Sequence, residues 1–244
     1  MARPAINFCN GTETRNMPAS GPFCAIFDLD GTLVDTAPDL AAGMNAAMAD
    51  AGLPPVPVAT VRHLVGRGAR VLVERGLAIN GIAHPGDGEI DRLVAIFLSH
   101  YRENIAAGSV AYDGAVDVLK ALSARGVRMG VCTNKPTDLA VKLLQLLELD
   151  HFFHAILGAD ALPVKKPHPE HLFETIRRSG GAVERAVMIG DSETDVATAR
   201  AAGVPVIVFS HGYTAIAPQD LGADVVLDHF DGLLPALTSA GLAP

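Results

Sequence analysis

Two carboxylates, Asp28 and Asp30, stand two residues apart directly after the apolar run Phe23 to Phe27. In an extended chain, side chains at this spacing point to the same side, so both carboxylates face one place. Two negative charges that close repel each other, and a bound divalent cation relieves the repulsion. Asp191, which follows another apolar run, adds a hard oxygen ligand of the kind that Mg²⁺ takes. The pattern therefore predicts a magnesium site.

Donor groups follow two further apolar runs. A carboxylate that attacks an anionic phosphate needs nearby positive charge and hydrogen-bond donors, because like charges otherwise keep the two apart. Lys166, Thr133 and the backbone N–H groups near Gly31 and Asn134 could supply them. Each motif alone has an ordinary structural explanation, such as a turn, a fragment of a calcium loop or a helix cap. Their order along the chain favours one shared site.

Alternating segments must position these residues. Short apolar runs, typical of buried strands, alternate with segments of helical spacing, which predicts an α/β fold with a Rossmann-like parallel sheet between helices. Ligands collect at the carboxyl ends of such strands, where all the motifs fall. The expected strands are 23–27, 127–132, 155–157, 186–189 and 204–209, and the expected helices between them include 139–147, 172–178 and 196–202.

One interval interrupts the alternation. Residues 37–107 contain helical patterns and no convincing strand, which predicts an all-helical domain inserted into the sheet domain. The expected core domain is therefore 21–36 together with 108–244. Residues 1–20 lack an apolar centre and are expected to form a disordered tail.

Composition excludes several classes of protein. The net charge of −8 over 244 residues gives no basic surface for nucleic acid. No apolar run approaches the ~20 residues that span a bilayer. The three cysteines lack CxxC spacing, so neither a disulfide framework nor a zinc site is expected, and a reducing cytoplasm fits best. The sequence does not indicate an oligomeric state.

Four segments resemble the motifs of the haloacid dehalogenase (HAD) superfamily, and the resemblance extends from Phe23 to about Leu237. These segments are Phe27 to Asp35, Thr133 to Lys135, Lys166-Pro167 and Gly190 to Asp195. The resemblance implies a phosphatase in which Asp28 attacks phosphorus and carries an aspartyl-phosphate intermediate. Asp30 would protonate the leaving alkoxide and then activate water.

The resemblance also implies the binding groups. Mg²⁺ would be held by Asp28, by the backbone carbonyl of Asp30 and by Asp191, with Asp195 just outside the ligand set. Phosphate would be bound by Thr133, Asn134 and Lys166. The helical insert would be a cap that closes over the site and excludes water.

Superfamily membership does not fix the reaction. Dehalogenases lack the acid–base aspartate that Asp30 provides here. Phosphonatases use a cap lysine, and residues 37–107 contain none. Phosphomutases of the superfamily also tend to use a basic cap residue, so the missing lysine makes a phosphomutase less favoured as well. Transport ATPases need membrane spans. A catalytically silent binding protein stays a less favoured alternative, because every motif residue needed for turnover is present.

Substrate specificity is expected to depend on how the cap contacts the leaving group. Residues 35–40, 65–69, 133–136 and 165–169 resemble, more narrowly, bacterial phosphatases of 2-phosphoglycolate, which implies hydrolysis to glycolate and phosphate. Pyrophosphate, a phosphosugar or a nucleotide remain alternatives. Arg67, between Gly66 and Gly68, is the expected specificity residue, because a guanidinium suits a carboxylate.

Overall fold

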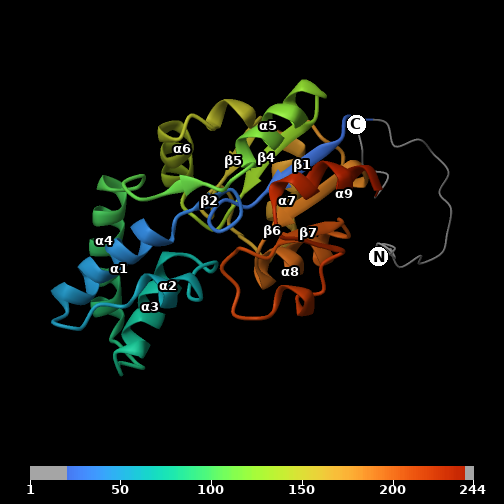
Figure 1. The fold of residues 1–244 in the computed structure, drawn as a ribbon. Coiled ribbons are helices and arrows are strands. Elements are labelled where there is room, and N and C mark those ends of the chain that lie inside the picture. Colours follow the sequence, from blue (N-terminus) through green and yellow to red (C-terminus); the bar gives the residue numbers. More distant parts are fainter. Residues whose placement is uncertain (1–20, 240–244) are drawn as a thin grey trace.

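The computed structural model describes residues 21–239. The expected tail, residues 1–20, lies outside this range, as do residues 240–244 of the expected core. A six-stranded parallel sheet forms the centre of the molecule, which confirms the α/β, Rossmann-like prediction (Figure 1). In sheet order, the strands are β5 (Ala155–Leu157), β4 (Arg128–Cys132), β1 (Cys24–Phe27), β6 (Ala186–Gly190), β7 (Val206–Phe209) and β8 (Val225–Leu227).

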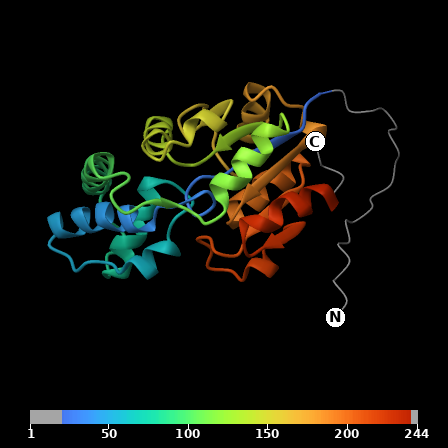
Figure 2. The ribbon, with the colours of Figure 1, turned by 45° about the horizontal axis from the view of Figure 1, so that its top comes forward.

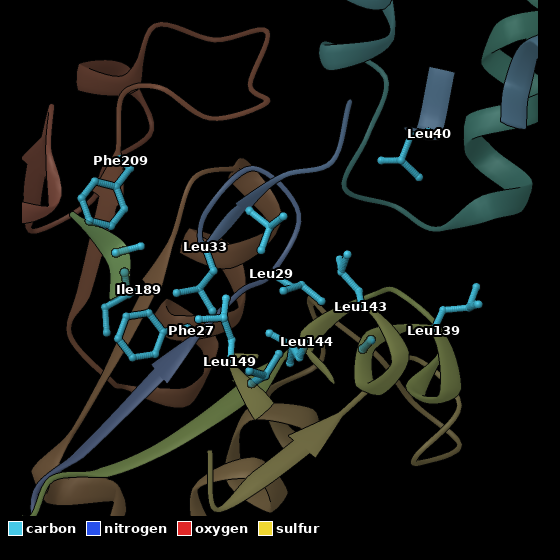
Figure 3. Close-up of a cluster of buried hydrophobic side chains, with 14 of the residues drawn as sticks. Phe27, Leu29, Leu33, Leu40, Leu139, Leu143, Leu144, Leu149, Ile189 and Phe209 are labelled. Atoms are coloured by element: carbon cyan, nitrogen blue, oxygen red, sulfur yellow. The ribbon is translucent and has the colours of Figure 1, made fainter. Parts of the chain in front are cut away.

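Side chains alternate between the two faces of the sheet, as the period of an extended chain requires. On β1, Ala25 and Phe27 join one buried cluster, while Cys24 and Ile26 join a second. The first cluster is covered by α5 (Ala115–Ala124), α6 (Thr137–Leu146) and α9 (Leu233–Ser239), and the second by α7 (Pro169–Arg178) and α8 (Glu193–Ala202). Figure 3 shows Phe27 among leucines of the first cluster.

Four helices follow β1 before the chain returns to the sheet. They are α1 (Ala37–Asp50), α2 (Val58–Arg62), α3 (Ala69–Ile79) and α4 (Asp87–Glu103). They stand together beside the sheet, at the left of Figure 1, and the turned view of Figure 2 shows the same separation. We call this group the cap helices. A short antiparallel pair, β2 (Val34–Asp35) with β3 (Val110–Ala111), connects them to the sheet.

The buried apolar cluster of the sheet continues into the cap helices. Leu40 of α1 and Leu72 of α3 belong to the same cluster as Phe27 and Leu139. Among residues 21–239, each helix is too short or too polar to cross a bilayer.

Candidate active site

Four predicted site residues meet at one edge of the sheet. Strand β1 pairs in parallel with β4 and with β6, so their carboxyl ends lie side by side. Asp28 directly follows β1, Thr133 follows β4 and Asp191 follows β6, while Lys166 arrives from the loop between β5 and α7. All four side chains are buried. The topology thus gathers residues that are far apart in the sequence.

Three carboxylates form a cluster at this edge. Asp28, Asp191 and Asp195 each offer an oxygen, and these atoms lie within 4.8 Å of one another. Asp191 is held from both sides, because Thr32 Oγ1 donates to its Oδ1 at 2.5 Å and the Tyr213 backbone N–H donates to its Oδ2 at 2.7 Å. Fixed oxygens of this kind form a preorganised ligand set.

Gly31 allows the chain to turn closely over this cluster. Its φ of +85° belongs to the left-handed region that glycine adopts without a steric penalty. A Cβ at this position would lie 2.6 Å from Asp191 Oδ2 and 2.9 Å from the Tyr213 ring. The glycine of the Asp-Leu-Asp-Gly motif is therefore required both by the turn and by the space beside Asp191.

Lys166 supplies the positive charge of the cluster. Its Nζ lies 2.6 Å from Asp195 Oδ1 and 3.0 Å from Asp28 Oδ1, and only 2% of the residue is exposed. Burial alone would lower the pKa of the ammonium, but the two carboxylates outweigh it and raise the pKa above its ordinary value. Lys166 therefore stays charged.

Asp195 positions Lys166 rather than facing the cavity. Its Oδ2 accepts hydrogen bonds from the backbone N–H groups of Asp191 and Ser192 and from Ser192 Oγ, closing a capping box at the start of α8. Its Oδ1 accepts from Lys166 Nζ. Both oxygens of Asp195 are therefore occupied, although it lies next to Asp28 and Asp191, which could bind a metal.

The carboxyl groups of Asp28 and Asp191 are unfavourable to ionise in the absence of a cation. Burial, only partly offset by Lys166, raises the pKa of Asp28 to about 6. Burial together with Asp195 and Asp28 raises the pKa of Asp191 well above its ordinary value. Such clustered oxygens fit a hard divalent cation, which would remove the repulsion and hold both groups ionised.

A cavity of about 50 Å³ lies between the strand ends and the cap helices. The sheet side contributes Asp28, Asp30, Thr133 and Asn134 to its lining. The cap side is mostly apolar, with one hydroxyl from Tyr101. The apolar lining residues are Leu40, Val65, Ala69, Leu72, Phe97 and Leu98 on the cap side and Pro136 and Leu139 on the sheet side.

Two predicted residues have contacts that the sequence did not indicate. The Asn134 side-chain amide donates to the carbonyls of Gly66, in the cap loop, and of Lys166, at 3.0 and 3.1 Å. Its side chain thus connects cap and core, which leaves its backbone as the group available to a phosphate. Arg67 is exposed and does not line the cavity, although Gly66 and Gly68 on either side do.

Sequence reasoning missed Lys135 and Tyr101. Lys135 Nζ lies 2.8 Å from Asp30 Oδ1 and 2.6 Å from the hydroxyl of Tyr101 in α4. Lys135 directly follows the recognised Thr133-Asn134 pair and could have been singled out by its position alone. Tyr101 carried no signal, because an aromatic residue at helical spacing is usually a packing residue.

Tyr213 was also missed, and it connects the carboxylate cluster to the β2–β3 pair. Its hydroxyl donates to Asp35 Oδ1 at 2.6 Å and accepts from the Ala37 backbone N–H at 2.8 Å, while its own N–H holds Asp191. Asp35 also forms an ion pair with Arg62 of α2 at 2.6 Å. Contacts across such long sequence separations leave no local pattern.

Comparisons with known proteins agree on one family. The model of the haloacid dehalogenase-like hydrolases matches residues 24–203. The chain is 46% identical over 213 residues to a phosphoglycolate phosphatase of Agrobacterium fabrum, covering 87% of this chain and 91% of that protein. It is 48% identical over 205 residues to a phosphoglycolate phosphatase of Caulobacter vibrioides, covering 84% and 86%.

A solved structure extends the similarity to the fold. The crystal structure of a predicted phosphoglycolate phosphatase from Haemophilus somnus superposes with a TM-score of 0.83 at 31% identity. The match covers 90% of this chain and 99% of that one, so it includes the cap helices as well as the sheet.

Proposed function

The chain belongs to the haloacid dehalogenase-like hydrolase family, and on that basis we propose that it hydrolyses 2-phosphoglycolate to glycolate and phosphate with Mg²⁺. It is a phosphoric monoester hydrolase, as the sequence predicts. The observation that carries the proposed substrate is the small cavity at the strand ends, which is lined by Asp28, Asp30 and the cationic side chain of Lys135, 2.8 Å from Asp30.

The first step transfers the phosphoryl group to the protein. Asp28 attacks phosphorus, so a bond forms between its carboxylate oxygen and phosphorus while the bond to the ester oxygen breaks. Asp30 gives its proton to the departing alkoxide of glycolate. Thr133 and Lys166 bind phosphoryl oxygens, and the charge of Lys166 offsets the negative charge that Asp28 and the phosphate bring together.

The second step returns Asp28 to its starting state. Asp30, now ionised, takes a proton from a water molecule that attacks phosphorus, and the bond to Asp28 breaks with release of inorganic phosphate. The helices of residues 37–107 act as a cap that keeps other water from the intermediate. The Asn134 contact with the Gly66 carbonyl supports this role, because it fastens a cap loop over the core.

Asp28, Asp191 and the backbone carbonyl of Asp30 would hold the cation, with Asp195 outside the ligand set. When bound, Mg²⁺ supplies positive charge to the phosphoryl oxygens and keeps Asp28 ionised. The buried carboxylate cluster supports this assignment, because its charges have one ammonium, Lys166, as their close counterion among the described residues.

Cavity size supports a small leaving group. A water molecule needs roughly 10–15 Å³ on this measure, so about 50 Å³ accommodates only a few water-sized groups. A glycolate fits that scale, whereas a nucleoside does not unless the cap opens. The size favours a small alcohol such as glycolate over a nucleoside as the leaving group.

The test is a magnesium-supplemented panel of phosphate esters ranked by kcat/KM. We expect 2-phosphoglycolate to lead, ahead of pyrophosphate, hexose phosphates and nucleotides. A flat ranking would instead identify a phosphatase of broad specificity, and a lead for another compound would replace the proposed substrate.

Mg²⁺ binding should stabilise the protein in a pH-dependent way. Carboxyl groups whose folded pKa is raised hold protons more tightly in the folded state, so they destabilise the metal-free protein as pH rises from about 4 through about 6. Mg²⁺ must compete with those protons. We expect saturating Mg²⁺ to add about 3 kcal/mol of unfolding free energy at about pH 8 and much less at about pH 5, measured by denaturant unfolding. An equal gain at both pH values would contradict the proposed ligands.

Two sequence predictions remain proposals. Arg67 is proposed to contribute to substrate selection, although its side chain is exposed here. A reducing cytoplasm is proposed from the cysteine pattern, and the free thiols of the buried Cys24 and Cys132 suit it.

A further inference from the structure

Lys135 is a buried cation in the wall of the cavity. It is 5% exposed, and its Nζ contacts both oxygens of Asp30, at 2.8 and 3.1 Å, and the Tyr101 hydroxyl at 2.6 Å. Among the described residues that line the cavity, it is the only one with a cationic side chain. The proposed mechanism gives it no task.

We propose that Lys135 binds the carboxylate of the substrate and thereby selects 2-phosphoglycolate over esters of uncharged alcohols. The inference rests on the proposed function and assigns a residue to its specificity. An ammonium carries three donors, and Nζ contacts three acceptors among the described residues, the two oxygens of Asp30 and the hydroxyl of Tyr101. Because two of these acceptors belong to one carboxylate, a substrate carboxylate in the cavity can replace the longer Asp30 contact, at 3.1 Å, and leave the shorter one in place.

The position of Lys135 matches the shape of the substrate. The leaving oxygen of 2-phosphoglycolate must lie beside Asp30, which protonates it, and the carboxylate carbon is two bonds further on. An ammonium that already touches Asp30 lies on the same side as that carboxylate. The phosphate end of the substrate would be bound by a different cation, Lys166, which contacts Asp28 and Asp195. The site thus provides one cation for each anionic end.

Tyr101 places this cation from the cap side. Lys135 Nζ lies 4.5 Å from the centre of the Tyr101 ring, and that ring stacks on Phe97 of the same helix at 5.8 Å between centres. The ammonium is therefore held between a core carboxylate and a cap aromatic residue. The side chain proposed to bind the carboxylate is thus also a contact between the core and α4.

The experiment compares two substrates that differ in the carboxylate. We expect Lys135→Met to lower kcat/KM for 2-phosphoglycolate by about 10- to 100-fold more than for ethyl phosphate, the range of a hydrogen bond between charged groups. Both rates will fall somewhat, because Asp30 loses its partner. Lys135→Gln, which keeps a donor but no charge, provides a second folded variant and should show the same selective loss. Lys135→Arg should retain most of the preference.

Binding without turnover gives an independent measurement. 3-Phosphonopropanoate and propylphosphonate cannot be hydrolysed and differ in the carboxylate, so calorimetry should show that Lys135→Met removes the preference for the former. Arg67→Ala is the matched comparison, because Arg67 is the other candidate for the carboxylate.

The outcomes separate the two proposals. Equal losses on both substrates in the Lys135 variants, or a selective loss in Arg67→Ala alone, would overturn the role of Lys135 and leave the proposed function intact. A wild-type protein with no preference for 2-phosphoglycolate over ethyl phosphate would overturn the proposed function, and this inference with it.

Discussion

Asp28→Asn is expected to lower kcat for 2-phosphoglycolate by about 10⁴-fold or more, because an amide cannot form the phosphoryl intermediate. The structure also predicts that this loss is not caused by misfolding. The substitution removes one of three buried carboxylates that lie together. Ionisation of the wild-type Asp28 carboxyl group is already unfavourable, since its pKa is raised to about 6. At about pH 8, the metal-free variant should therefore unfold at a temperature no lower than the wild type does.

The matched control is Asp113→Asn. This change has the same chemistry at a side chain that is 99% exposed, and we expect turnover close to that of the wild type. Mass spectrometry of acid-quenched wild-type protein should detect an added phosphoryl group that is absent from Asp28→Asn. Substantial turnover by the purified variant would show that another group attacks phosphorus.

The sheet and most of its strand ends could be predicted because their signals are local. A run such as Cys24 to Phe27 is apolar at every position, since both faces of a central parallel strand are buried. Strand β8 (Val225–Leu227) was missed, and all three of its residues are partly exposed at the sheet edge, whereas β5 at the opposite edge is equally short but ends in the buried Leu157. The β2–β3 pair was missed because each strand has two residues.

The residues of the candidate site likewise fall into those with a local sequence signal and those without one. Asp28, Asp30 and Asp191 stand at the ends of recognisable strands, so position along the chain was sufficient to single them out. The contacts of Lys135 with Tyr101 and of Tyr213 with Asp35 join residues 34 and 178 positions apart, and neither pairing leaves a periodic pattern. The sequence indicated which polar groups gather at the sheet edge, but not how the cap helices complete the cavity.

Arg67 shows most clearly what the sequence could not predict. An arginine between two glycines is by residue type a reasonable group to bind a carboxylate, yet in the structure the backbone of Arg67 faces the core. Its carbonyl accepts a hydrogen bond from Lys165 Nζ at 3.3 Å, while its side chain is exposed. The direction of one side chain in a loop is set by tertiary contacts, which the sequence alone does not specify.

Lys166→Met is expected to affect both stability and turnover. The change removes the ammonium that lies 3.0 Å from Asp28 and 2.6 Å from Asp195, and leaves buried carboxylates without their counterion. Breaking a buried ion pair on one side costs about 3–5 kcal/mol of unfolding free energy. Loss of the charge beside the transferring phosphoryl group should lower kcat by about 10³-fold.

The pH dependence distinguishes this explanation from a simple packing defect. Without the ammonium, which lowers the pKa of Asp28, this carboxyl group should hold its proton to still higher pH in the folded state, so the variant regains stability as pH falls from about 8 to about 5. Lys165→Met, the same change at the exposed neighbouring lysine, should leave the unfolding free energy within about 0.5 kcal/mol of the wild type. A deficit in Lys166→Met that is constant across this pH range would mean that Lys166 contributes mainly by packing, and its assignment to the charge balance of the site would fail.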